Sequence, residues 1–439
     1  MSGPRGGVFR YLDYAVDADR GVLTCRYELN GREFTERVTL PPCARWHTEQ
    51  ARAAARLVFL LSGVSYYKTA APPVIDFGET ALTGAEEAFL REFYLQGLGE
   101  FAYRNHLDLI SLGLRAQRAP DQPSAPSAPA GPLRALVPFG GGIDSIVTVE
   151  QVRRQADVAL FVVSRPGDRF DAIEQPAAVT GLPVVRAERE IDPQLLRSAE
   201  LGFLNGHVPV TGILSAIAVL AAVLTGRDAV VMSNEWSASV PTLEHAGRSV
   251  NHQYSKSEEF EAAFRGVLAD QGSRPAYFSW LRDRTELWVG ERFAALTQYH
   301  GSFRSCNKAF YAERSRRLAH WCGQCDKCCF IDLILAPFLP AEALRRIFAV
   351  AGEPLADPGL AAKFRSLLGA GAKPFECVGE VAECRAAVLL AARRDDRAGT
   401  ALLQELAAEV ASWPDAPSET ETAAMLRPVG RNFIPPGYR

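Results

Sequence analysis

The sequence predicts an α/β fold in which helices cover both faces of a parallel sheet. Between residues 133 and 232, short apolar runs typical of buried strands alternate with segments of helical spacing. This alternation indicates βαβ units, which build parallel sheets. The first strand leads into three consecutive glycines, and a Pro/Ala/Ser-rich stretch precedes it. We expect a small α+β domain before this sheet and a helical region after it.

The amino-acid composition favours a soluble globular protein over a membrane-spanning, secreted or nucleic-acid-binding one. The 439 residues leave room for about two or three domains, and 48% of them are hydrophobic, enough for a sizeable core. The formal net charge is −3, so the chain as a whole offers no electrostatic attraction for nucleic acid. No apolar run approaches the ~20 residues of a membrane span, and the first residues lack the apolar core of a signal peptide. We expect a soluble cytoplasmic protein that binds neither nucleic acid nor membranes.

Residues 1–117 predict the small α+β domain. Strand patterns occupy 8–40, and Asn30-Gly31 between two alternating runs is a strong signal for a β-hairpin. Helical spacing follows in two further segments, 49–61 and 86–115. We identify no catalytic cluster in this domain.

The stretch 118–132 predicts a flexible linker, and the sheet-bearing domain is expected at 133–339. Beyond the first strand, the strand-like runs are 158–163, 182–186 and 228–232, and an apolar helix-like run occupies 209–224. Parallel sheets bind ligands at the carboxyl ends of their strands. Two groups of residues follow such ends, Ser164-Arg165 and Ser233-Asn234-Glu235, so we expect them at the edge that carries the glycines.

Gly140, Gly141 and Gly142 join the first strand to a helix that opens at Asp144-Ser145. Glycines allow positive φ and a close approach to a ligand, and the free N–H groups of a helix N-terminus bind anions. A carboxylate such as Asp144 repels phosphate unless a divalent cation lies between them. The loop therefore predicts a site for Mg²⁺-bound polyphosphate, with Asp144 as the metal ligand. The alternative is a glycine-rich turn that binds nothing.

Two common phosphate loops do not match. The G-x-x-x-x-G-K-[ST] loop needs a lysine where Asp144 stands, and G-x-G-x-x-G fails after Gly142. The stretch instead resembles the PP-loop of the N-type ATP pyrophosphatases, S-G-G-x-D-S, with Gly140 in place of the first serine. This resemblance implies a PP-loop ATP pyrophosphatase-like fold and ATP as a ligand. It also implies that the end of the second strand, at Ser164, borders the adenine.

A polar block follows the strand at 228–232. Residues 251–257, NHQYSKS, can all donate or accept hydrogen bonds or protons. Such a loop after a sheet strand is typical of a binding loop. The alternative is a solvated connector in which Ser257 caps a helix that begins at Glu258. Both interpretations can hold together.

Five cysteines crowd between residues 306 and 329. Cys322, Cys325 and Cys328 are spaced as two C-x-x-C pairs, and Cys306 completes a set of four that suits tetrahedral zinc. Cys329 is then left over. Free thiols at a helix end and an iron–sulfur cluster are the alternatives. Neighbouring cations could instead face the polyphosphate of a nucleotide substrate: Arg314, Arg316, Arg317 and Lys327.

Residues 340–439 predict a helical region that is Ala-rich to about Trp413. It is interrupted by PFECVGE, which places Cys377 between Glu376 and Glu380. A thiolate or a carboxylate can take a proton from carbon and return it. Taken alone, Cys377 is better explained as a buried inert thiol.

The motifs PFGGGIDS, VVMSNEWSAS, VNHQYSKS, WCGQCDKC and PFECVGE together resemble the bacterial UDP-N-acetylmuramoyl-L-alanyl-L-glutamate epimerase family of peptidoglycan synthesis. The resemblance spans most of the chain. It implies ATP- and Mg²⁺-dependent inversion of the terminal L-glutamate of a UDP-linked muramoyl dipeptide, with release of AMP and diphosphate. It also implies an upstream ligase that adds L-glutamate. A lysine is expected after the glycines, where this chain has Ile143, so Lys256 or an arginine would replace it.

The implied chemistry assigns roles to the motif residues. Attack of the glutamate carboxylate on the α-phosphate of ATP gives an acyl-adenylate, whose α-hydrogen is far more acidic than that of a free carboxylate. The glycines and Ser145 would cradle the diphosphate while Asp144 holds Mg²⁺. Candidates for proton transfer or substrate anchoring are His252, Lys256, Cys377 and Glu380.

Two other classes of protein compete with this interpretation. One is a PP-loop enzyme that modifies a nucleobase or tRNA, such as a deazaguanine nitrile synthase or a sulfur transferase, since these also combine the loop with a cysteine cluster. The other is a non-catalytic nucleotide-binding regulator, which consumption of ATP would exclude.

Overall fold

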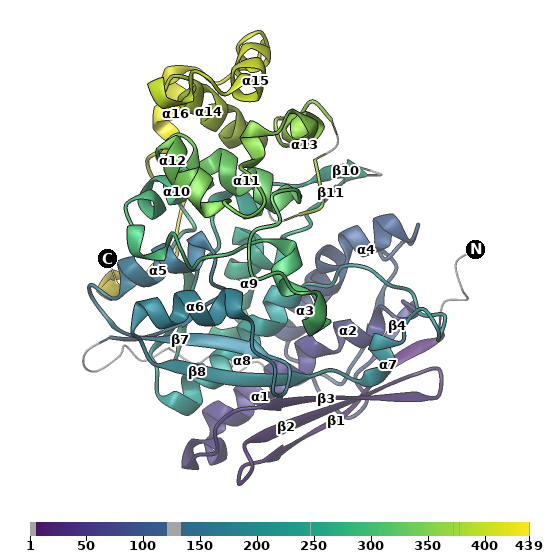
Figure 1. The fold of residues 1–439 in the computed structure, drawn as a ribbon. Helices are drawn as coiled ribbons and strands as arrows, with labels where there is room; N and C mark the ends of the chain where they lie inside the picture. Colours follow the sequence, from purple (N-terminus) through teal and green to yellow (C-terminus); the bar gives the residue numbers. More distant parts are fainter. Residues whose placement is uncertain (1–5, 121–132, 246, 372, 377, 439) are drawn as a thin grey trace.

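A ten-stranded, mostly parallel sheet runs through the base of the molecule, and a helical region stands above it (Figure 1). This computed structural model describes residues 6–120, 133–245, 247–371, 373–376 and 378–438. The strand order is β12-β9-β6-β7-β8-β3-β2-β1-β4-β5. The expected α/β class with a parallel sheet and a helical C-terminal region is confirmed.

The parallel part of the sheet carries the predicted strands. They are β6 (Arg134–Pro138), β7 (Asp157–Ser164), β8 (Val184–Glu190) and β9 (Ala229–Met232), and the sequence analysis missed β12 (Ala276–Ser279). All five are joined by parallel pairing. Their carboxyl ends therefore meet at one edge, as the sequence analysis expected of the residues after β6, β7 and β9.

Helices cover both faces of this part of the sheet. One face packs on α8 (Val210–Thr225) and α9 (Glu258–Asp270), while α1 (Glu49–Ser62) packs on α8 and α3 (Gly84–Gly97) packs on α9 in the same core. The other packs on α5 (Ile143–Val152), α6 (Asp171–Thr180) and α10 (Glu286–Ala294). Alternate residues of β6 divide between the two cores: Leu136 joins the first, and Ala135 and Val137 join the second. Because these strands are buried on both faces of the sheet, their sequences are continuous apolar runs and do not alternate with polar residues.

The N-terminal hairpin extends the same sheet. It consists of β1 (Val8–Asp17), β2 (Val22–Leu29) and β3 (Arg32–Thr39). Asn30 and Gly31 have φ of +54° and +76°, as a two-residue hairpin turn of the predicted kind requires. Because β3 pairs antiparallel with β8, residues on either side of the predicted linker build one sheet. Most of that linker, 121–132, lies outside the described residues.

The helix expected over 86–115 is only partly right. The structure has α3 and α4 (Gly99–Arg104), then β5 (Gly113–Arg115), which pairs with β4 (Val74–Asp76). His106 has φ +53°, which ends the helical path, and pairing with β4 outweighs the apolar spacing that suggested a helix. The short remaining elements are α2 (Val64–Tyr67), α7 (Pro193–Leu196) and the ribbon β10 (Leu243–His245) with β11 (Arg248–Val250).

The C-terminal region is helical as predicted. It follows α11 (Asp326–Leu335) and comprises α12 (Ala341–Ile347), α13 (Ala361–Leu367), α14 (Val381–Ala392), α15 (Ala401–Ala411) and α16 (Glu419–Met425). The tail then returns to the sheet-bearing part, where the N–H of Val429 donates to the carbonyl of Asp283 and the buried Tyr438 ring contacts Phe278. Among the described residues, no helix is long and apolar enough to cross a bilayer.

Candidate active site

The three glycines form a tight connection between β6 and α5. Gly142 is the N-cap of α5, and Ser145 donates its hydroxyl hydrogen to the carbonyl of Gly142 at 3.1 Å. Gly141 has φ +77°, and a Cβ there would lie 2.2 Å from the carbonyl oxygen of Ala172 on α6. Only glycine therefore fits at this turn. The expected strand–turn–helix arrangement is present, with the helix opening at Ile143, one residue before Asp144.

A cavity of about 420 Å³, here called the central cavity, opens over the glycine loop at the carboxyl edge of the sheet. Its apolar wall includes Phe161, Val163, Leu214 and Phe310. Its polar lining includes Gly140, Gly142, Asp144, Ser145, Ser233, Asn234, Lys256, Arg304, Ser305 and Lys327. This volume and this lining suit a ligand with one apolar and one anionic end.

The cations of the central cavity come from three separate segments. Lys256 lies on the polar loop before α9, Arg304 follows α10, and Lys327 lies in the first turn of α11. Ile143, which stands where the family resemblance implies a lysine, is 1% exposed and packs in the core. Positive charges from other segments thus surround the loop, whose own residues 140–145 include no cation.

Three carboxylates meet at the loop end of this cavity. One oxygen each from Asp144, Glu235 and Glu286 lies within 4.8 Å of the other two. Oδ1 of Asp144 is buried and has no hydrogen-bond partner among the described residues. Burial, together with the negative charge of Glu235, raises the pKa of Asp144 to about 7, and burial raises the pKa of Glu286 well above its usual value. Such a group needs either protons or a cation.

The helical region adds a fourth buried carboxyl to this group. Glu383, on α14, accepts a hydrogen bond at 3.1 Å from the backbone N–H of Leu287, and burial raises its pKa to about 8. The negative charge of Glu383 in turn raises the pKa of Glu286. Acidic side chains from the sheet-bearing part and from the C-terminal helices therefore converge on the same point.

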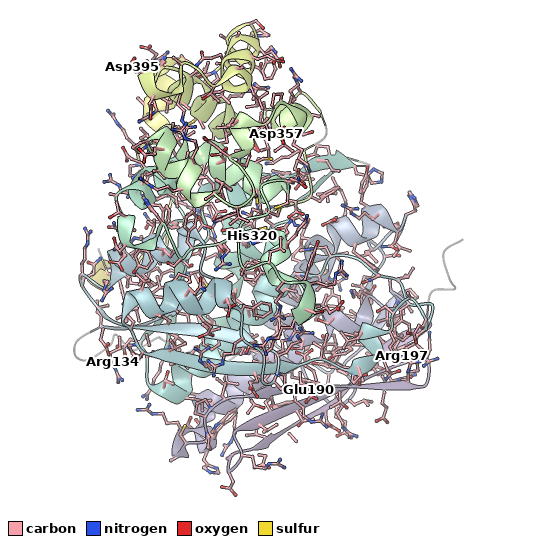
Figure 2. All side chains as sticks on the ribbon, in the orientation of Figure 1. Arg134, Glu190, Arg197, His320, Asp357 and Asp395 are labelled. Atoms are coloured by element: carbon pink, nitrogen blue, oxygen red, sulfur yellow. The ribbon has the colours of Figure 1, made fainter. Side chains whose placement is uncertain are left out.

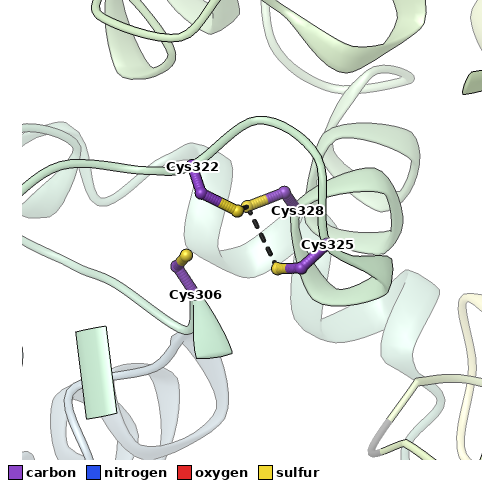
Figure 3. A group of neighbouring side chains, drawn as sticks. All are labelled: Cys306, Cys322, Cys325 and Cys328. Carbon is purple, nitrogen blue, oxygen red and sulfur yellow. Dashed lines mark hydrogen bonds between the residues drawn. The ribbon is translucent and has the colours of Figure 1, made fainter. Parts of the chain in front are cut away.

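The four predicted cysteines lie together (Figure 3). The sulfurs of Cys306, Cys322, Cys325 and Cys328 all lie within 4.8 Å of one another, with 3.4 Å between Cys325 and Cys328 and 3.6 Å between Cys322 and Cys328. Zn–S bonds of about 2.3 Å place tetrahedral ligands about 3.8 Å apart, so the spacing suits zinc. Hydrogen bonds from Cys325 and Cys328 lower the pKa of Cys306 to about 3.

The cysteine group adjoins two residues of the cavity lining in the chain. Cys306 follows Ser305, and Lys327 stands between Cys325 and Cys328. His320, on the loop leading to these cysteines, lies between the sheet and the C-terminal helices (Figure 2). A metal ion bound here would fix two cavity-lining segments to each other.

Two family models match the chain. The MurL N-terminal domain matches residues 2–280, and the MurL C-terminal domain matches residues 302–421. The chain belongs to the MurL family.

Three relatives of this MurL chain bear the name UDP-N-acetyl-alpha-D-muramoyl-L-alanyl-L-glutamate epimerase. The protein from Salinispora tropica is 39% identical over 99% of this chain and 95% of its own length. That from Xanthomonas oryzae pv. oryzae is 39% identical over 98% and 95%, and that from a Micromonospora species is 38% identical over 99% and 97%. No solved structure matches the chain, so its likeness to the PP-loop enzymes rests on the loop motif.

Some predicted residues of this MurL chain lie away from the central cavity. Ser164 ends β7 beside Val163 but does not line the cavity, and Gly141 turns toward α6. Glu380 pairs with Lys373 at 3.0 Å and caps α14 by accepting from its own following N–H. Cys377 lies outside the described residues.

The polar loop and the arginine-rich segment also contain predicted residues that do not line the central cavity. His252 is not part of the cavity lining; its Nδ1 hydrogen-bonds the carboxylate of Glu100. Ser257 caps α9 by accepting from the N–H of Phe260 at 3.1 Å, as predicted. Arg317 is held by Asp168 through two hydrogen bonds, of 2.6 and 2.7 Å, so its charge is already paired.

Sequence reasoning missed Glu235, Glu286 and Glu383 as partners of Asp144. The sequence analysis placed Glu235 at the carboxyl edge of the sheet but did not connect its carboxylate with that of Asp144. Glu286 is the first residue of α10, and Glu383 lies in the first turn of α14. The helix dipole favours acidic residues at these positions, so neither residue indicates a site by itself. Glu286 and Glu383 approach Asp144 only because α10 and α14 pack beside the loop, and this packing is not evident from the sequence.

Proposed function

We propose that this MurL chain epimerises the terminal L-glutamate of UDP-N-acetylmuramoyl-L-alanyl-L-glutamate to D-glutamate in peptidoglycan synthesis, using ATP and releasing AMP and diphosphate. Three relatives that align with nearly the whole chain carry the name of this epimerase. The observation that supports the use of ATP is the glycine loop, which opens into a cavity of about 420 Å³ beside buried carboxylates.

Carboxylate adenylation is the step that the loop would serve. Removing the α-proton of an ionised glutamate adds a second negative charge to the same group. Attack of that carboxylate on the α-phosphate of ATP forms an acyl-adenylate, which is neutral at the carbonyl, and expels diphosphate. The α-proton is then acidic enough for a side chain to remove, and hydrolysis after reprotonation returns the free carboxylate and AMP.

The central cavity offers complementary surfaces for ATP. The phenylalanines Phe161 and Phe310 suit the adenine, and the N–H groups at the start of α5 suit the phosphates. Lys256, Arg304 and Lys327 supply the positive charge that the family lysine would supply at Ile143.

Mg²⁺ and Zn²⁺ have separate places in this proposal. Asp144, Glu235 and Glu286 would hold Mg²⁺, a choice supported by the unpartnered Oδ1 of Asp144 and by an all-oxygen donor set. The bound ion would screen the triphosphate from these carboxylates. The four cysteines would hold a structural Zn²⁺.

The proposed substrate must be the product of an earlier enzyme. A dipeptide that ends in L-glutamate must be made by a ligase that adds L-glutamate, and we propose such a ligase as the functional partner. We place both in the cytoplasm.

The test is incubation of the protein with the UDP-linked L-alanyl-L-glutamate substrate, ATP and Mg²⁺ in D₂O, followed by assays of AMP, α-deuterium and D-glutamate. We expect AMP together with deuterated D-glutamate. Asp144→Asn should lower AMP release by roughly 100-fold because the metal site loses a charge. Asp19→Asn, an exposed control on the β1–β2 turn, should leave it unchanged.

Each other outcome rejects part of the proposal. AMP without α-deuterium would reject epimerisation and keep ATP cleavage. Absence of AMP with this substrate would reject the proposal and direct attention to nucleobase or tRNA substrates, or to a regulator that binds nucleotide without consuming it.

A further inference from the structure

A second cluster of titratable side chains lies outside the lining of the central cavity, and two of its three residues are on segments that lead into that lining. Glu100 on α4, His207 before α8 and His252 on the polar loop each place one ligand-type atom within 4.8 Å of the other two. His252 hydrogen-bonds Glu100 through Nδ1, and the two imidazole rings lie 4.3 Å apart between centroids, at 44°. Both histidines are partly buried, and the side chain of His252 is 14% exposed.

The surroundings of His207 favour its neutral form. Burial, together with the neighbouring charge of His252, lowers the pKa of His207 to about 4. His207 is therefore neutral near pH 7 and has a free lone pair on one ring nitrogen. Although burial opposes ionisation of Glu100, the hydrogen bond and charge of His252 lower the pKa of Glu100. The cluster thus places a proton acceptor beside a second imidazole that is hydrogen-bonded to a carboxylate.

The chain connects this cluster to the central cavity at two points. His207 stands four residues before Thr211, which lines the cavity at the start of α8. His252 stands four residues before Lys256, which also lines it. The charge of Lys256 partly offsets the raised pKa of Asp144 and adds to the lowering of the pKa of His207, so Lys256 lies within electrostatic reach of the loop and of His207.

We propose that His207 is a catalytic residue that exchanges the α-proton on one face of the substrate's glutamate, and that His252 and Glu100 position it. The assignment rests on the proposed function. The lone pair of His207 forms an N–H bond to the α-proton, and the C–H bonding pair moves into the activated acyl group as an enolate. In the reverse step, the imidazolium returns the proton and the C–H bond forms again.

The charge of His252 makes this transfer reversible. A protonated His207 would stand beside a second imidazolium, with ring centroids 4.3 Å apart. Repulsion between these like charges favours return of the proton to carbon. Glu100 holds His252 in place during this cycle.

The ring spacing also limits the pair to one face. If the α-carbon lay between two rings and contacted both, the rings would have to be about 7 Å apart, because each carbon–ring contact distance is about 3.5 Å. The His207 and His252 rings are too close for this. Inversion therefore requires a different group on the opposite face, and loss of His207 should affect the two epimers unequally.

The test compares the wild type with His207→Asn, using the L-glutamate and D-glutamate forms of the substrate separately with ATP and Mg²⁺ in D₂O. We expect AMP release within about threefold of wild type and net epimerisation at least 100-fold slower. Deuterium should still enter one epimer, the one served by the opposite face, and not the other. His47→Asn, at an exposed histidine, is the matched control and should match the wild type.

A second variant tests positioning. Glu100→Gln should lower kcat for deuterium exchange about tenfold with KM and AMP release unchanged, since it weakens the hold on His252 without touching substrate. An effect on KM alone would contradict this role.

Three outcomes would overturn the assignment of His207. They are exchange retained in both epimers, exchange lost equally from both, and AMP release lost together with exchange. Failure of the wild type to release AMP or to incorporate deuterium would instead reject the proposed function, so the two failures are distinguishable.

Discussion

Gly140 and Gly141 are neighbours in one loop but meet different constraints. At Gly141 a Cβ would lie 2.2 Å from the carbonyl oxygen of Ala172, and φ is +77°. At Gly140 a Cβ would meet no atom within 4 Å. The S-G-G-x-D-S motif has serine at the first of these positions. The structure accommodates either residue there, which explains how the chain departs from the motif without losing the turn.

Substitutions at the two glycines should therefore diverge. Gly140→Ser should change the free energy of unfolding by no more than about 0.5 kcal/mol and preserve AMP release. Gly141→Ala should cost at least about 2 kcal/mol, because it combines a left-handed backbone with a clash against main chain. Denaturant titration and the AMP assay measure both effects. A Gly141→Ala protein as stable as the wild type would show that the loop takes another conformation.

At the scale of elements, the cysteine loop and α11 act as one unit. Cys325 is the N-cap of α11, Cys328 lies in its first turn, and Cys306 reaches them from the segment after α10. Cys329, next in sequence, is buried outside the group of four, and burial raises its pKa to about 12. The helix therefore presents one thiol to the group and a neighbouring thiol to the core.

Metal analysis should distinguish these thiols. We expect about one equivalent of zinc per chain, reduced in Cys325→Ser and retained in Cys329→Ser. Loss of the metal should lower the free energy of unfolding by several kcal/mol and reduce AMP release, because Lys327 and Ser305 depend on the group for their places. Elemental analysis and denaturation are the measurements. Iron with labile sulfide in place of zinc would establish a cluster, and a metal-free wild type would favour free thiols.

Local signals explain which elements could be predicted. The hairpin at Asn30-Gly31 and the four cysteines were found because turn chemistry and ligand spacing are local in sequence. The segment at 105–115 was misread because pairing with β4 decides its structure. The cluster of Glu100 and His207 with His252 escaped notice because three separate segments must pack together to form it.

At the scale of the whole molecule, a buried ion pair joins the N-terminal hairpin to the parallel strands. Glu36 on β3 is 0% exposed and receives hydrogen bonds from Arg189 on β8 at 2.9 and 3.1 Å, and from the hydroxyl of Tyr66 at 2.9 Å. On the same side of the sheet, α1 packs along α8. The domain boundary placed between residues 117 and 133 stays a prediction, but both segments contribute to one core.

The chain should consequently unfold as one unit that depends on this pair. Arg189→Met leaves a carboxylate buried without its counter-charge and should cost about 3 to 5 kcal/mol. Arg37→Met is the matched control on the same two strands: Arg37 and Glu190 are half exposed, with 3.5 Å between nitrogen and oxygen, and its loss should cost at most about 1 kcal/mol. Denaturant titration read by fluorescence and by hydrogen exchange should show a single transition in every variant. Early loss of protection confined to residues 6–117 in Arg189→Met would show instead that the hairpin segment is an independent domain docked on the sheet.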